Sequence, residues 1–285
     1  MSIDFTAKAK PETMAAPIIR TQIYEIQTPA EAEAMLTLGV DHIGSVLLSE
    51  ADWRLPVLRE TVRTVQGAGG QSSLIPLFNT PDAVYRTLDY YGPDIVHFCE
   101  VLTAEGGGRS AEELLALQEG VRQRFAQTAI MRSIPIAPPG RADTETVLAL
   151  ARLFEPVSDW FLTDTLQVEP AGTAPGDQPV AGFVGITGKT CDWTVAAELV
   201  KQSAIPVILA GGLSPENVFD GCLAVRPAGV DSCTLTNARD ADGQPIRFAK
   251  DAERVRRFVA ETRRAQAALA DGSSPPAESR LEGQG

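Results

Sequence analysis

The ten residues 209–218 have the composition of a phosphate-binding loop. They read Leu-Ala-Gly-Gly-Leu-Ser-Pro-Glu-Asn-Val and follow a short apolar run that is typical of a buried strand. Gly211 and Gly212 carry no Cβ, so an anion can approach their peptide N–H groups. Ser214 as N-cap and Pro215 at the first helical position predict a helix start, whose positive end favours an anion. The alternative is a tight strand-to-helix turn that binds nothing.

The same layout recurs along the chain, which favours a repeated unit over an isolated turn. In each repeat a polar residue and a proline follow an apolar run, as at Thr28-Pro29, Thr80-Pro81 and Ser214-Pro215. Each predicted helix then runs into a turn of the form Gly-x-Asp, at 39–41, 92–94 and 229–231. A capped helix, a glycine that ends it and a new apolar run together indicate a strand–helix–strand unit with parallel strands.

Eight apolar runs qualify as strands: 19–26, 41–48, 73–79, 94–99, 128–136, 158–164, 205–210 and 230–235. Helical stretches with a 3.6-residue apolar period lie between them. Eight strands that alternate with helices over roughly 250 residues predict an α/β fold, a (β/α)8 TIM barrel in a single domain spanning 18–270. The competing doubly wound sheet is less favoured, because no glycine-rich fingerprint follows the first strand.

Composition restricts the function classes. The 285 residues carry a formal net charge of −12 and no long basic run, which argues against a nucleic-acid partner. No apolar run reaches membrane-spanning length, and residues 1–17 lack the apolar core of a secretory signal, so we expect a cytoplasmic protein without a membrane partner. We expect 1–17 to be a flexible extension and 271–285 a disordered tail. Two histidines and four unpaired cysteines predict no metal site.

Several segments together resemble the phosphoribosylanthranilate isomerase family. The segment 185–193, Gly-Ile-Thr-Gly-Lys-Thr-Cys-Asp-Trp, is similar to that family's glycine-rich loop and following Phe-Asp-Trp. The strand end 161–164 is similar to the family's Leu-Leu-Asp, and 209–218 is close to its Leu-Ala-Gly-Gly-Leu-x-Pro-Glu-Asn-Val. Residues 229–232 resemble the start of its Gly-Val-Asp-x-Ser-Ser-Gly. The resemblance covers about 20–262 and is strongest from 164 to 231.

The resemblance implies an Amadori rearrangement in tryptophan biosynthesis, without a cofactor. A phosphoribosyl arylamine opens its ring, passes through a Schiff base and an enolamine, and becomes an amino-deoxyketose. The partner it implies is this small phosphorylated sugar-amine, with the protein a monomer or homodimer. An acid must protonate the ring oxygen and a base must remove the proton from C2. Asp164 lies where the family keeps its general acid; the alternative is a loop-ordering role.

The position of the family's base differs in this chain. The family's first strand reads Lys-x-Cys-Gly, whereas this chain has Gln-Ile-Tyr-Glu at 22–25, so Tyr24 replaces the thiol. A phenol with an ordinary pKa of about 10 is a poor base at neutral pH. His97 and Cys99 share one face of the fourth strand and are candidate substitutes, as are Glu25 and Glu100 if a local bend turns them inward. Both His97 and Cys99 also suit an ordinary core.

The resemblance also implies a phosphate site and a carboxylate-binding arginine. Gly188, Gly211 and Gly212 retain the permissive backbone of the phosphate site, and the family's Ser-Ser-Gly appears as Ser232-Cys233-Thr234. Cys233 is equally suited to packing. Arg54 is the candidate for the substrate's aromatic carboxylate, or else a solvated surface residue. Three functions stay open: an isomerase with a relocated base, an enzyme acting on a different phosphorylated sugar, and a catalytically silent ligand-binding homologue.

Overall fold

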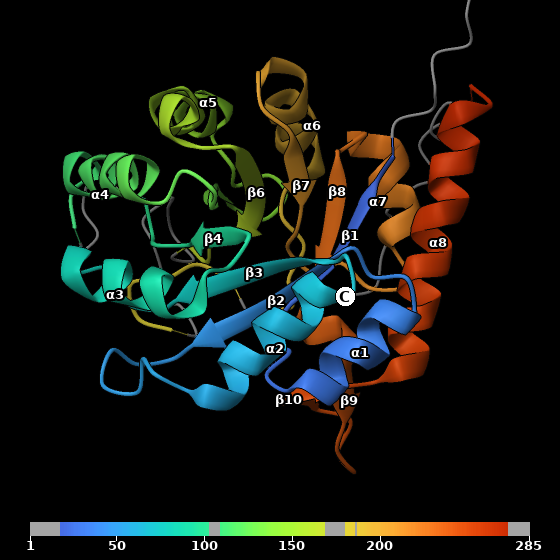
Figure 1. The fold of residues 1–285 in the computed structure, drawn as a ribbon. Helices are drawn as coiled ribbons and strands as arrows, with labels where there is room; N and C mark the ends of the chain where they lie inside the picture. The colour runs from blue at the N-terminus through green and yellow to red at the C-terminus, as the bar shows by residue number, and fades with distance from the viewer. Residues whose placement is uncertain (1–17, 103–108, 169–179, 186, 273–285) are drawn as a thin grey trace, which may run out of the picture.

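Eight parallel strands form a closed barrel surrounded by helices in this computed structural model (Figure 1). The structure describes residues 18–102, 109–168, 180–185 and 187–272. The strand order around the barrel is β1 to β8 in sequence, and β1 pairs with β8 to close it. The predicted (β/α)8 barrel is therefore confirmed. The predicted extension 1–17 lies outside the described residues, as does the predicted tail 271–285 from residue 273 onward.

Each of the eight predicted strands is present, with ends shifted by a few residues at most. The strands are β1 (Arg20–Ile23), β2 (His42–Leu47), β3 (Gln71–Pro76), β4 (Ile95–Phe98), β5 (Ala129–Ile136), β6 (Trp160–Thr165), β7 (Val207–Leu209) and β8 (Gly229–Ser232). Almost every strand residue is buried, because a barrel strand faces packed side chains inside and helices outside. Continuous apolar runs were for this reason the right signal.

The helices follow the strands in alternation. They are α1 (Pro29–Thr37), α2 (Pro56–Gly67), α3 (Pro81–Tyr91), α4 (Ala111–Arg124), α5 (Thr144–Phe154), α6 (Trp193–Gln202), α7 (Val218–Val225) and α8 (Ala252–Ala270), with short 3-10 turns at Glu155–Val157 and Thr234–Thr236. Thr28 caps α1 in a reciprocal capping box with Glu31, as the Thr-Pro signal predicted. No described helix has the length and apolar character needed to cross a bilayer.

Two details of the repeat that contains Ser214-Pro215 differ from the prediction. α7 begins at Val218 rather than at Pro215, and Ser214 does not cap it. The Asn217 side chain accepts from the Ser214 N–H and donates to the Gly212 carbonyl, which holds 214–217 as a separate turn. Gly229 is the first residue of β8, and the left-handed residue that ends α7 is Arg226. The predicted helix start and glycine helix stop were wrong here.

An antiparallel hairpin after β8 was not anticipated. β9 (Asn237–Arg239) pairs with β10 (Pro245–Lys250) beneath α1 in the view of Figure 1. Its strands place Asn237 and Arg247 against Glu25 at the end of β1. The hairpin therefore covers one side of the barrel mouth.

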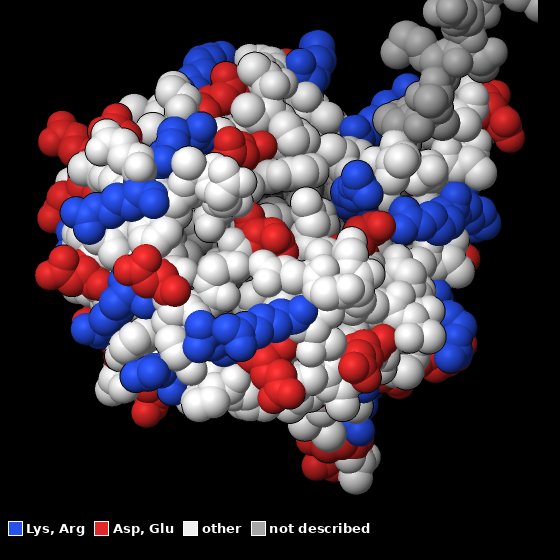
Figure 2. All heavy atoms as spheres, viewed as in Figure 1, with Lys and Arg blue, Asp and Glu red and all other residues white. Residues whose placement is uncertain are grey.

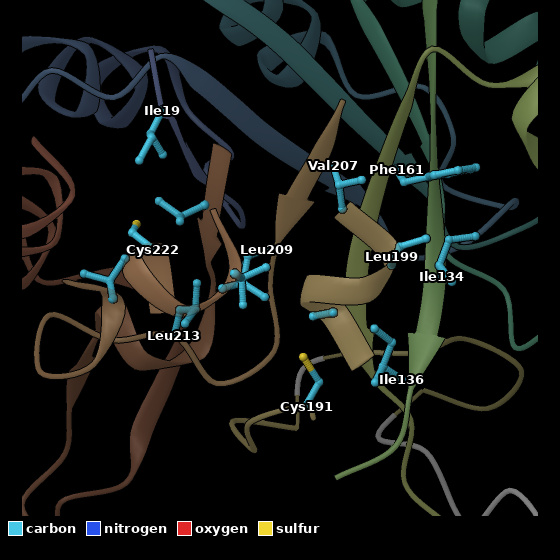
Figure 3. Close-up of a cluster of buried hydrophobic side chains, with 14 of the residues drawn as sticks. Ile19, Ile134, Ile136, Phe161, Cys191, Leu199, Val207, Leu209, Leu213 and Cys222 are labelled. Atoms are coloured by element: carbon cyan, nitrogen blue, oxygen red, sulfur yellow. The ribbon is translucent and has the colours of Figure 1, made fainter. Parts of the chain in front are cut away.

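The main hydrophobic core lies between the strands and the outer helices. Figure 3 shows its part near β5 to β8, where Ile134, Phe161 and Leu209 pack with Leu199 of α6 and Cys222 of α7. This packing fixes the loops that follow these strands. Figure 2 shows acidic and basic side chains interspersed over one face of the molecule rather than gathered by sign.

Candidate active site

Two adjoining cavities open at the carboxyl ends of the barrel strands. The first has a volume of about 360 Å³, part of it open to solvent, and is lined by residues at the ends of β6 and β8, after β7 and β8, and in the loop before α6: Asp164, Thr187, Gly188, Gly211, Gly212, Leu213, Asp231, Ser232, Cys233, Thr234 and Leu235. Loops at this end of a barrel carry the ligand sites of the fold. The two glycine segments predicted to bind phosphate therefore meet in one cavity.

Backbone crowding explains the two adjacent glycines of this first cavity. A Cβ on Gly212 would lie 2.5 Å from the carbonyl carbon of Lys189, and one on Gly211 would lie 2.3 Å from Oγ1 of Thr165. Both glycines have positive φ, 89° at Gly211 and 61° at Gly212. The loop at Gly211 and Gly212 thus approaches the loop at Lys189 at a distance that only glycine permits. The peptide groups of both loops can then face a bound anion.

The second cavity is mostly apolar and has a volume of about 530 Å³, part of it open to solvent. Its lining residues come from the inner faces of the first, second, third, fourth, sixth and eighth strands and from the loop 180–185: Tyr24, Glu25, Val46, Ile75, Leu77, His97, Cys99, Leu162, Asp164, Val180, Phe183, Val184, Gly185, Asp231 and Cys233. Aliphatic and aromatic walls of this kind suit a planar aromatic group. None of these described lining residues is a lysine or an arginine.

Three residues line both cavities: Asp164, Asp231 and Cys233. They mark the boundary between the glycine-lined and the apolar cavity. A molecule with an anionic group in one cavity and an aromatic group in the other would have its middle part beside two carboxyl groups.

Asp164, the predicted acid, lies at this boundary near the carboxyl end of β6. Its Oδ1 accepts from the Thr165 N–H at 2.8 Å, and a Cβ on Gly185 would lie 2.4 Å from Oδ2, so the loop passes directly over the carboxyl group. Burial raises the pKa of Asp164 to about 7, although the Thr165 hydrogen bond opposes the shift. A carboxyl group that is half protonated near neutral pH can serve as a general acid.

Tyr24 and His97 contact each other within the barrel. The Tyr24 hydroxyl lies 2.6 Å from Oγ of Ser73 and 2.7 Å from Nδ1 of His97, and Nε2 of His97 lies 2.8 Å from Oγ of Ser133. Burial raises the pKa of Tyr24 well above its usual value. Burial also lowers the pKa of His97 to about 3. Both polar groups are thus engaged with one another and with neighbouring hydroxyls.

The other candidate bases also lie at the apolar cavity. Burial, reinforced by Glu100 and Asp164, raises the pKa of the Cys99 thiol well above its usual value. Glu25 has a positive φ of 65° in the position where the family has glycine. Its carboxylate accepts from Arg247 at 2.7 Å and from the Phe248 N–H, so the hairpin holds it as an ion pair.

Arg54 does not line either cavity. Its guanidinium stacks over the Tyr90 ring, with 4.9 Å between Cζ and the ring centroid, and the residue is exposed. Ser232 and Thr234 do line the glycine cavity, and the Ser232 hydroxyl donates to the Leu213 carbonyl. Within the described residues, no cluster of His, Cys, Asp and Glu is placed to hold a metal ion.

Asp231 is a site residue that the sequence analysis did not predict. The Gly-x-Asp pattern suggested a turn residue like Asp41 and Asp94, whose carboxylates accept backbone N–H groups from the neighbouring strands at Thr21 and Ser72. Asp231 instead is the third residue of β8 and faces inward. The resemblance to the family's Gly-Val-Asp was a signal that would have drawn attention to it.

Comparison with known proteins agrees with this geometry. The family model of N-(5'-phosphoribosyl)anthranilate (PRA) isomerase matches residues 131–260. The N-(5'-phosphoribosyl)anthranilate isomerase of Haloferax volcanii is 29% identical over 255 residues, which cover 88% of this chain and 96% of that protein. Together these matches support membership of the phosphoribosylanthranilate isomerase family. The crystal structure of phosphoribosyl anthranilate isomerase from Thermotoga maritima superposes with a TM-score of 0.61 at 18% identity, covering 86% of this chain and 99% of that one.

A further solved structure of the phosphoribosylanthranilate isomerase family contains a ligand. It is a phosphoribosyl anthranilate isomerase in complex with reduced 1-(o-carboxyphenylamino)-1-deoxyribulose 5-phosphate, with a TM-score of 0.58 and 16% identity over 86% of this chain and 99% of that one. The family model begins within β5, so it matches the half of the barrel that contains Asp164 and the glycine loops. The half that contains Tyr24 lies outside that match.

Proposed function

We propose that this protein is an enzyme, a phosphoribosylanthranilate isomerase of tryptophan biosynthesis that converts N-(5'-phosphoribosyl)anthranilate into the corresponding amino-deoxyketose. The observation that carries the proposal is the boundary between the two cavities, where a cavity suited to a phosphate adjoins one suited to an aromatic ring beside Asp164. The names of the similar family members point to the same substrate.

The substrate has its phosphate at C5 of the sugar and its arylamine at C1. In our proposal the peptide N–H groups near Gly188, Gly211 and Gly212 hold the phosphate, with Ser232 and Thr234 beside it. The aromatic ring occupies the apolar cavity against Val46, Ile75 and Phe183. The sugar then bridges the two and places its ring oxygen beside Asp164.

Asp164 acts as the general acid in this proposal. Its protonated carboxyl group donates to the ring oxygen while the nitrogen lone pair forms the Schiff base at C1. The raised pKa keeps a fraction of this group protonated near neutral pH, and the loop at Gly185 limits the access of water. Tyr24 occupies the position of the family's thiol in this chain. Another residue must therefore remove the C2 proton.

Rescue of a tryptophan auxotroph that lacks the isomerase tests the proposal, followed by a steady-state assay of the purified protein. We expect rescue by the wild-type chain and none by Asp164→Asn. Asp94→Asn, at the opposite end of the barrel, is a matched control that should still rescue. Turnover only of another phosphorylated sugar would favour the enzyme with a different substrate. Binding of the reduced substrate analogue without turnover of any substrate would favour the silent homologue.

A further inference from the structure

The base that removes the C2 proton can be sought among the inward-facing residues around the boundary of the cavities. The role of this base rests on the proposed function, since it belongs to the same reaction. The base must be ionisable near neutral pH and must reach the sugar between the phosphate and the ring. Tyr24 and Cys99 have raised pKa values, and the pKa of His97 is lowered to about 3 while both its nitrogens are in contact with hydroxyls.

Asp231 lies next to the family's thiol position, on the adjacent strand. β8 pairs with β1, and the register places Asp231 beside Gln22, two residues before Tyr24. Because alternate residues of a strand face the same side, Gln22, Tyr24 and Asp231 all face the interior. A carboxyl group from β8 thus takes up a place close to the one that the thiol would have had on β1.

Asp231 also lies where the reacting carbon atoms of the bound sugar would be. Together with Asp164 and Cys233 it lines both cavities, at the point where C1 and C2 of a bridging sugar would be. Burial raises the pKa of the third member, the Cys233 thiol, well above its usual value, which leaves the thiol protonated at neutral pH. The two carboxyl groups are the members of this trio that ionise in the required range.

The hydrogen bonds around the two carboxyl groups differ and assign them different roles. Burial raises the pKa of Asp231 to about 7 and the charge of Asp164 adds to this shift, whereas the hydrogen bond that Gln22 Nε2 donates to Oδ1 at 3.1 Å and the positive charge of Lys250 oppose it. Asp164 accepts only from its neighbour's N–H among the described residues. Since both pKa values are raised to about 7, the hydrogen bonds decide where a shared proton lies: the Gln22 side-chain amide donates to Asp231 and favours its ionised form, and we assign the proton to Asp164.

We propose that Asp231 is the general base of this isomerase and replaces the thiol of the family. Asp164 first gives its proton to the ring oxygen, the C1–O bond breaks, and the nitrogen lone pair forms the Schiff base. Asp231 then takes the proton from C2, and the C–H electrons form the C1=C2 bond of the enolamine as the C=N electrons return to nitrogen.

The second half of the cycle restores both groups. Asp231 returns its proton to C1, and the C2 hydroxyl loses its proton to the Asp164 carboxylate as the ketone forms. At the end Asp164 is protonated and Asp231 is ionised, as at the start. No net proton is consumed and no oxidant or reductant takes part, as an isomerisation requires.

Asp231→Asn in the full-length chain is the decisive variant. Asparagine has the same shape, and its amide oxygen can still accept from Gln22, so the fold and the affinity for the reduced substrate analogue should be retained within about threefold. We expect kcat to fall by about 100- to 10,000-fold, the usual contribution of a positioned base. The kinetic isotope effect for substrate deuterated at C2 should increase, since proton removal becomes rate-limiting. Asp164→Asn should lower the same isotope effect toward unity, because ring opening becomes rate-limiting instead.

The pH profile separates a chemical role from a structural one. For the wild type, kcat/KM should fall on the acid side as the second carboxyl group of the pair becomes protonated, and Asp231→Asn should lack this acid limb. The described titratable groups that line the apolar cavity with Asp231 are Asp164, Tyr24, Glu25, His97, Cys99 and Cys233, and the charge of Lys250 also acts on Asp231. Of these, Asp164 contributes the alkaline limb, which should persist in Asp231→Asn.

Each failure can be recognised. An active wild type with an inactive Asp164→Asn but an Asp231→Asn variant within tenfold of wild-type turnover would overturn the role of Asp231 and leave the proposed function intact. Loss of analogue binding together with turnover in Asp231→Asn would make Asp231 a structural residue and would equally overturn its role as base. Absence of turnover by the wild type would overturn the proposed function and the role of Asp231 with it.

Discussion

The hydroxyl oxygen of Tyr24, which follows β1, lies 2.7 Å from Nδ1 of His97 in β4. The contact therefore crosses the interior of the barrel. The same oxygen lies 2.6 Å from Oγ of Ser73. The Tyr24 ring occupies space that exists because Gly44 has no side chain: a Cβ there would lie 2.1 Å from Cδ1 of the ring. Tyrosine at the family's thiol position is therefore part of a packed polar network and forms a wall of the apolar cavity.

Tyr24→Phe tests whether this network is structural. The variant removes the hydroxyl and leaves Ser73 and His97 with one partner fewer in a buried setting, so we expect the free energy of unfolding to fall by about 1–3 kcal/mol. Because the phenol takes no proton in our proposal, the turnover rate should change by less than about tenfold. Urea denaturation and the steady-state assay measure the two effects. If turnover instead drops at least about 100-fold while analogue binding is unchanged, the phenol takes part in the chemistry.

The two histidines should stay neutral across the physiological range. Burial lowers the pKa of His42 to about 4 and that of His97 to about 3. The unfolded chain, with histidine pKa values of about 6.5, binds more protons below that pH, so the free energy of unfolding should fall as the pH falls from about 6.5 toward 4. In an NMR titration the two imidazole signals should not move between about pH 5.5 and 8. A midpoint near 6.5 for His97 would contradict the buried network.

Much of the fold was predictable because its signals are local. Apolar runs of strand length gave all eight barrel strands, and Thr28-Pro29 gave α1, since the Thr28–Glu31 capping box needs only residues of that turn. The start of α7 was not predictable in this way. The Asn217 side chain accepts from the Ser214 N–H and donates to the Gly212 carbonyl, and the resulting turn 214–217 takes the place of the helical turn that Ser214-Pro215 would otherwise start.

The candidate site was predictable only where its residues follow the family pattern. Asp164 and the glycine loops were found by resemblance, and the structure brings them together. Arg54 could not be placed from sequence, because its stacking on Tyr90 of α3 depends on tertiary contacts. Asp231 was missed because a Gly-x-Asp sequence is compatible with a turn or with an inward-facing strand, and only the register with β1 decides between them.

Arg247 should control the pH dependence of stability through Glu25. Burial raises the Glu25 pKa, but the charges of Lys250 and Arg247 and the hydrogen bonds from Arg247 and Phe248 outweigh it, so the net pKa is lowered. A lowered carboxyl pKa stabilises the fold above the unfolded value of about 4.3, and this stabilisation is lost as the pH falls through the folded value.

The variant Arg247→Met removes this stabilisation and leaves the buried Glu25 short of positive charge. We expect a loss of about 1–3 kcal/mol at pH 7, less than for a fully buried pair because the Arg247 side chain is 40% exposed. The loss should shrink near pH 4.5, where Glu25 can take up a proton. Arg257→Met removes an ion pair in which both side chains are about half exposed and should change stability by less than about 0.5 kcal/mol. Equal urea midpoints for both variants at pH 7 would contradict the role of the pair.

Gly212→Ala should damage the phosphate cavity specifically. The new methyl group would lie 2.5 Å from the Lys189 backbone and force the two loops apart. We expect the dissociation constant for inorganic phosphate to rise by about tenfold or more, with a loss of about 1–3 kcal/mol in stability. Gly243→Ala is the matched control, because Gly243 also has a positive φ, 78°, but a Cβ there has nothing within 4 Å. A Gly212→Ala variant with unaltered phosphate affinity would place the anion elsewhere.

The enzyme should discriminate weakly between anthranilate and aniline as the aromatic part of its substrate. The described residues that line the apolar cavity include no lysine or arginine, and Arg54 is stacked on Tyr90 outside it. A carboxylate without a cationic partner gains little from binding, whereas a bidentate arginine contact would contribute a large part of the specificity. We expect kcat/KM for the phosphoribosyl aniline to be within about tenfold of the value for the anthranilate compound, and Arg54→Met to leave this ratio unchanged. A preference for anthranilate of about 1,000-fold or more that disappears in Arg54→Met would show that Arg54 moves into the cavity when the substrate binds.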